Sequence, residues 1–72
     1  MDAIKEFTRV ERMLIQAYGI QSYDNSRADY LQGYADAIFD IGERTSRVCT
    51  AYVDLCDKIK GLRSPEPITL TH

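Results

Sequence analysis

The residues best suited to chemistry are two cysteines and one histidine, and their spacing does not assemble a reactive site. Cys49 and Cys56 are seven residues apart, which on a helix places them on one face but roughly 10 Å apart, too far for a disulfide between them. His72 follows a segment with two prolines, so no cysteine–histidine or serine–histidine pair is expected. No glycine-rich phosphate loop or metal-ligand cluster is present in the sequence. We therefore expect no catalytic, cofactor or metal site, and reduced thiols.

Carboxylates are the other candidates, because they recur on one side of a predicted helix. This acidic stripe contains Asp29, Asp36, Asp40, Glu43, Asp54 and Asp57. It is either a solvated face or a docking surface for a basic protein or nucleoprotein. Phe39 and Val53 flank it, and Gly33 lies within it; Phe39 either packs under a neighbouring segment or anchors a partner. The candidate partner-binding residues are therefore Asp29, Gly33, Asp36, Phe39, Asp40, Glu43 and Val53.

The totals limit the class of protein. Seventy-two residues predict one small domain with a thin core, and the net charge of −2 argues against a generic nucleic-acid or membrane-surface binder. The first six residues mix acids and bases instead of the apolar run of a signal peptide. No apolar stretch approaches the ~20 residues of a membrane span, so a cytoplasmic location is expected.

The segment 2–18 is predicted to be a helix. Asp2 can cap its start, and Gly19 can end it in a left-handed conformation. The apolar residues follow one another at steps of four, three, four and three, as one helical face requires. They are Ala3, Phe7, Val10, Leu14 and Ala17.

A sevenfold apolar repeat runs through the rest of the chain and predicts one long helix over 27–60. One slot holds Leu31, Ile38, Thr45, Tyr52 and Ile59, and the other holds Tyr34, Ile41, Val48, Leu55 and Leu62. The rival interpretation divides this segment near Gly42, which weakens a helix, with Thr45 or Ser46 capping a new start. Because the register does not slip there, we favour the continuous helix. Residues 64–72 are expected to form an extended tail that is either frayed or docked in a groove.

Such a fold is all-α: a short helix and a long, possibly kinked helix form a hairpin in a domain spanning 1–63. A short helix covers only about half of a long one, so the uncovered apolar half predicts a homodimer that packs as a bundle. The expected dimer interface contains Val48, Tyr52, Leu55, Cys56 and Ile59. Charge is divided as well: 27–43 carries a net −3 and 44–63 a net +3, which suits antiparallel pairing of two such helices.

The stretch from Tyr30 to Ile38, YLQGYADAI, resembles a pattern in small helical proteins of bacteriophages and mobile elements. The resemblance implies an accessory or host-takeover role, including inhibition of bacterial defence systems as by anti-CRISPR proteins. Those inhibitors share no general motif, so it assigns no site residue. The leading hypothesis is a non-enzymatic protein that docks on a larger macromolecular complex and inhibits or modulates it. The alternatives are an antitoxin-like or transcription-cofactor-like regulator, touching DNA through Lys5, Arg9 and Arg12, and a structural oligomerisation module.

Overall fold

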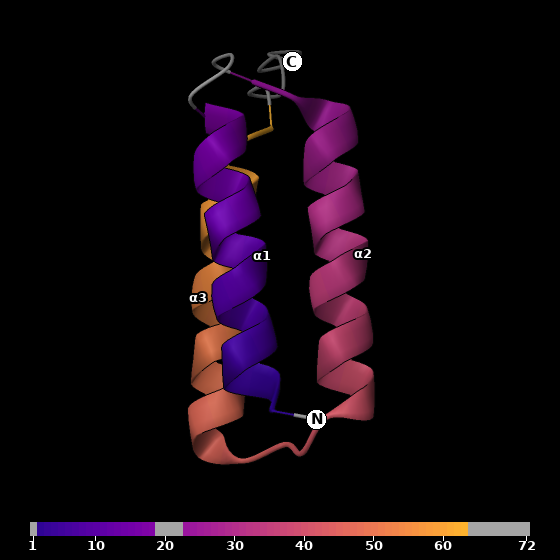
Figure 1. The fold of residues 1–72 in the computed structure, drawn as a ribbon, viewed down its shortest axis with the longest axis vertical. Coiled ribbons are helices and arrows are strands. Elements are labelled where there is room, and N and C mark those ends of the chain that lie inside the picture. The colour runs from indigo at the N-terminus through magenta and orange to yellow at the C-terminus, as the bar shows by residue number, and fades with distance from the viewer. Residues whose placement is uncertain (1, 19–22, 64–72) are drawn as a thin grey trace, which may run out of the picture.

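The computed structural model describes residues 2–18 and 23–63, which form three α-helices and no strand. These are α1 (Ala3–Tyr18), α2 (Asn25–Ile41) and α3 (Ser46–Lys60). The helices lie side by side, with α1 and α3 running in one direction and α2 in the other (Figure 1). The expectation of an all-helical chain is confirmed, and the expectation of a two-helix hairpin is wrong.

The first helix follows the predicted stripe closely. The Asp2 carboxylate accepts a hydrogen bond from the Lys5 backbone N–H at 3.2 Å, so it satisfies one of the free donors at the helix start. All five residues of the stripe, from Ala3 to Ala17, are buried. The predicted stop at Gly19 lies outside the described residues.

The prediction of one long helix over 27–60 is wrong, because the chain leaves helical geometry at Gly42. The Gly42 backbone is extended, and its N–H caps α2 by donating to the Ile38 carbonyl. A Cβ at Gly42 would lie 3.0 Å from that carbonyl oxygen and 3.1 Å from the Ala3 Cβ. Glycine is favoured at this turn because the start of α1 packs directly against it, a contact between distant parts of the sequence.

The new helix starts at Thr45, whose hydroxyl accepts from the Val48 backbone N–H at 3.1 Å. Thr45 occupies an apolar slot of the sevenfold repeat, yet its side chain is exposed and caps α3. The sevenfold spacing continues across the turn because α2 and α3 both face the same core and the length of the connection preserves that spacing. An uninterrupted sevenfold repeat therefore does not require an uninterrupted helix.

The ends of α2 and α3 are held against each other. Asp24 caps α2 by accepting from the Arg27 N–H at 2.9 Å. After α3 ends at Lys60, the chain turns so that Leu62 is fully buried. The Leu62 carbonyl accepts from the Asp24 N–H at 2.9 Å, which joins the end of the third helix to the start of the second.

The core lies along the centre of the bundle, and every buried residue in the described ranges is apolar. Each helix contributes a row, and α1 packs on α2 and α3 together. The buried residues beyond α1 are Ala28, Leu31, Ala35, Ile38, Val48, Leu55, Ile59 and Leu62. Because α1 already covers the seam of α3, the apolar surface that predicted a dimeric bundle is not exposed, and the structure does not support that bundle.

Candidate docking surface

The exposed side of α2 carries both acidic and apolar side chains. In α1 and α3 the apolar residues are largely confined to the core side, whereas in α2 they are spread more evenly around the helix. Two rows result. The acidic row consists of Asp29, Asp36, Asp40 and the following Glu43. The apolar row consists of Tyr30, Tyr34, Ala37 and Ile41.

Most of the acidic row is engaged by groups of the same chain. Asp29 pairs with Arg63 after α3, and Asp40 pairs with Arg44 at 3.1 Å. The opposite net charges of 27–43 and 44–63 thus meet within one chain, at the turn between α2 and α3 and just after the end of α3. Among the described residues, Glu43 of this row makes no ion pair. The acidic row is therefore less free to attract a partner than its sequence suggests.

Asp36 is the centre of a polar cluster between α2 and α3. Its Oδ1 accepts from the Tyr52 hydroxyl and from Gln32 Nε2, the latter at 2.9 Å. Gln32 also lies 3.3 Å from the Cys56 Sγ. The hydrogen bond to the Asp36 carboxylate, and then partial burial, raise the pKa of Tyr52 above its ordinary value, because the carboxylate favours the protonated hydroxyl. The cluster thus joins α2 and α3 through side-chain hydrogen bonds.

Phe39 does not point outward as an isolated aromatic. Its ring is half-buried and stacks on Tyr52, with centroids 4.3 Å apart and planes at 17°. The Arg44 guanidinium lies 4.6 Å from the ring centroid, so Phe39 has contacts that would compete with a partner. Gly33 is exposed with open space around it, and Val53 is 58% exposed on α3.

The residues proposed as a dimer interface lie inside the bundle or at its internal junction. Val48, Leu55 and Ile59 are buried, and Tyr52 and Cys56 are half-buried beside α2. Both cysteines are free thiols. Self-association remains a prediction, and it would need a surface other than this one.

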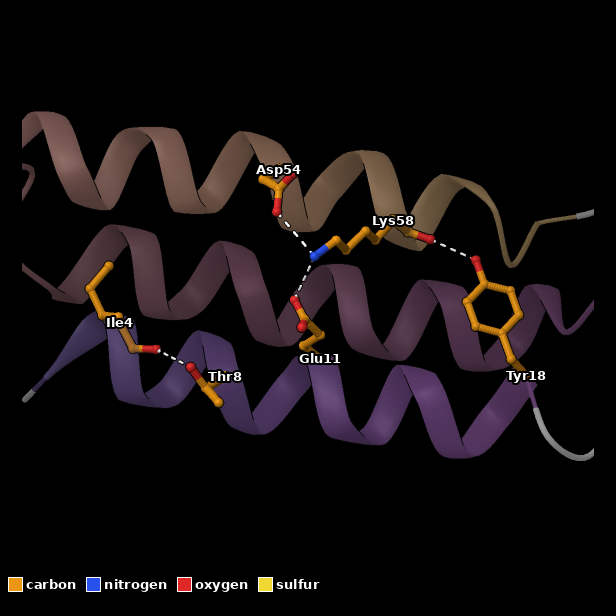
Figure 2. A network of polar contacts seen from close by, with 6 residues as sticks. All are labelled: Ile4, Thr8, Glu11, Tyr18, Asp54 and Lys58. Carbon is orange, nitrogen blue, oxygen red and sulfur yellow. Dashed lines mark hydrogen bonds and ion pairs between the residues drawn. The ribbon is translucent and has the colours of Figure 1, made fainter.

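A second polar network connects α1 with α3 (Figure 2). Lys58 Nζ lies 2.8 Å from a Glu11 oxygen and 3.1 Å from an Asp54 oxygen, and the Tyr18 hydroxyl donates to the Lys58 carbonyl at 2.9 Å. Glu11, and then Asp54, raise the pKa of Lys58 by stabilising its charged form. Asp54 of the predicted acidic stripe is thus paired within the network between α1 and α3.

The apolar row borders a shallow groove that the sequence pattern does not predict. The groove lies between α1 and α2 and is lined by Glu6, Tyr34, Ala37, Ile38 and Ile41. Ile41 is 74% exposed and Tyr30 is 53% exposed. The sevenfold repeat predicts that Tyr34 and Ile41 lie in the buried seam of one long helix. The sequence feature that argues against burial of Ile41 is Gly42. If α2 ends there, Ile41 loses the helical neighbours that the sevenfold repeat supplies.

A basic row lies on the outer side of α1. Lys5, Thr8, Arg9 and Arg12 line one shallow depression, and the two arginines and the lysine are exposed. Arg9 is also within 3.5 Å of Glu6, a long contact between partly exposed groups. The three bases named from the sequence are thus brought together on one face.

In the described ranges, no three histidine, cysteine or carboxylate side chains converge as a metal site would require. No described helix is long and apolar enough to cross a membrane. Models of known protein families, curated proteins and solved structures give no match to this chain.

Proposed function

We propose that the protein is a non-enzymatic docking protein that binds a larger macromolecular complex through the exposed side of α2 and inhibits or modulates it. The apolar row supplies the centre of contact, and the acidic row forms part of the polar rim around it. Interfaces of this kind combine a few large apolar anchors with charged surroundings that set orientation and association rate.

The observation that carries the proposal is the position of Ile41 and its neighbours. A surface helix ordinarily keeps its large aliphatic residues on the core side. Here the core of α2 is complete with Ala28, Leu31, Ala35 and Ile38, while Ile41 is 74% exposed at the end of the helix. An apolar residue so exposed adds little to folding, and together with Tyr30 and Tyr34 it forms a contact surface of the type that partners bind.

The class of target follows from the resemblance of residues 30–38 to small helical proteins of bacteriophages and mobile elements. Both tyrosines of the apolar row, the exposed Tyr30 and the half-buried Tyr34, lie in that segment. We therefore propose a complex of a bacterial defence system as the target, with inhibition by steric blocking, because the chain needs no chemistry of its own to block a surface.

Affinity capture from a bacterial lysate tests the proposal. The tagged protein, the Ile41→Asp variant and the Ile15→Asp variant are compared, and retained proteins are identified by mass spectrometry. Ile15 is the matched control, because it is 61% exposed and lies on α1, outside the apolar row. A partner retained by the wild type and by Ile15→Asp but lost by Ile41→Asp supports docking through α2. If Ile41→Asp retains every partner, this surface is the wrong one.

A regulatory role involving nucleic acid is the second candidate, and the basic row of α1 favours it. Lys5, Arg9 and Arg12 lie around one depression, and lysine and arginine side chains are the ones that commonly contact phosphates. DNA binding measured at several salt concentrations distinguishes this candidate. Binding that weakens steeply with salt and is lost in Arg9→Glu would favour it over the docking protein.

A further inference from the structure

The groove between α1 and α2 combines an apolar floor with acidic side chains near one end. Its lining is aliphatic and aromatic apart from Glu6, which projects from the first turns of α1. The end of the groove lies where α1 begins and α2 ends, since Ala3 packs against Gly42 there. A short amphipathic helix is the usual occupant of such an open, elongated apolar depression.

Two acidic side chains contribute negative charge near this end of the groove. Glu6 is held by Arg9 only at 3.5 Å, and Glu43, two residues beyond Ile41, makes no ion pair among the described residues. Arg44 lies over the Phe39 ring and pairs with Asp40, and its Nε donates to the Phe39 carbonyl in the last turn of α2 at 3.4 Å.

We infer that the groove binds a basic amphipathic helix of the partner protein. Its aliphatic residues, one turn apart, would pack on Tyr34, Ala37 and Ile41, and its lysine or arginine side chains would meet Glu6 and Glu43. This inference rests on the proposed docking function and specifies the chemistry of the partner. The charge is what selects a basic helix over an acidic or neutral one, because an acidic segment would bring like charges together at the end of the groove.

Peptide selection against the full chain tests the inference. A displayed library of helix-forming peptides of about 16 residues, with random net charge, is selected on the wild-type protein, and the enriched peptides are titrated by fluorescence anisotropy. We expect enriched peptides to be basic, with aliphatic residues at a spacing of three or four. Ile41→Asp should weaken their binding at least about tenfold, and Ile15→Asp should leave it within about twofold. The double variant Glu6→Gln/Glu43→Gln should weaken it about threefold to tenfold at low salt, and less at high salt.

Circular dichroism of each variant shows whether the helices persist, and Ala37→Arg serves as a second groove variant if Ile41→Asp unfolds. The inference is overturned if no peptide is enriched, if the enriched peptides are acidic or neutral, or if binding survives both groove variants. It is also overturned if sedimentation shows a second copy of the chain covering the groove, as a dimer that Ile41→Asp dissociates. Capture of a partner through α2 in the lysate experiment, with failure here, would retain the docking function and reject only the basic helix.

Discussion

Removal of the Tyr52 hydroxyl isolates the contribution of the polar cluster between α2 and α3. In Tyr52→Phe the ring can keep its stacking on Phe39, and Asp36 keeps its hydrogen bond from Gln32 at 2.9 Å. The main interaction lost is the hydrogen bond to the Asp36 carboxylate, at a half-buried site. We expect the free energy of unfolding at pH 7 to fall by about 1 kcal/mol. For a chain of this size that corresponds to a midpoint about 4–8 °C lower.

The same hydrogen bond predicts a dependence on pH. The pKa of Tyr52 is raised in the folded state, chiefly by Asp36, so the folded protein keeps this proton where the unfolded chain has lost it. The stabilisation is therefore complete below the unfolded value of about 10 and declines as the pH rises toward the folded value. The stability difference between wild type and Tyr52→Phe should thus shrink above about pH 10.

Urea unfolding followed by circular dichroism at pH 7, 9, 10 and 11 measures that difference. Tyr30→Phe is the matched control, because Tyr30 is exposed and its hydroxyl makes no hydrogen bond with a described residue. Groups that titrate in all three proteins cancel in the comparison. A difference between wild type and Tyr52→Phe that stays constant up to pH 11 would refute the role of the Asp36 hydrogen bond, as would an equal effect of Tyr30→Phe.

Substitutions at three further positions test the described turns and helices by thermal unfolding. Gly33→Ala should stabilise the protein by about 0.5–1 kcal/mol, because the added methyl meets open space and alanine favours a helix; a lower midpoint would contradict this. Gly42→Ala should destabilise it by about 1–3 kcal/mol, since the new Cβ would crowd the Ile38 carbonyl and Ala3; an unchanged midpoint would show that α1 does not pack there. Thr45→Ala should cost about 1 kcal/mol through loss of the cap on α3, whereas Thr45→Ser should retain most of it.

Local patterns were sufficient for α1 and for the helical class. The stripe from Ala3 to Ala17 depends only on spacing along one segment, and Asp2 caps the residues next to it. Such signals act over a few residues, so the sequence displays them directly. The second half of the chain differs, because its organisation depends on which segment packs against which.

The sequence pattern alone does not determine whether the helix breaks at Gly42. The sevenfold spacing favours a long helix, and the glycine and Thr45 favour a turn, with no local measure of which is stronger. The contact of Gly42 with Ala3 favours the turn, and it joins residues 39 positions apart. The wrong predictions for the candidate site follow from the wrong prediction of one continuous helix. Phe39 acquired its neighbour Tyr52 through the turn, and Ile41 moved from the predicted seam to the surface.

The hydrogen bond from Asp24 to the Leu62 carbonyl has a consequence for synthesis on the ribosome. α1 and α2 can pack together as soon as they have emerged from the ribosome. Their shared apolar face remains exposed to water until α3 has been synthesised. The end of the bundle near Asp24 closes only with Leu62, which is fully buried. A nascent chain that stops before Leu62 would expose its apolar core residues to chaperones. The last helix must therefore be synthesised before the protein can acquire its native surface.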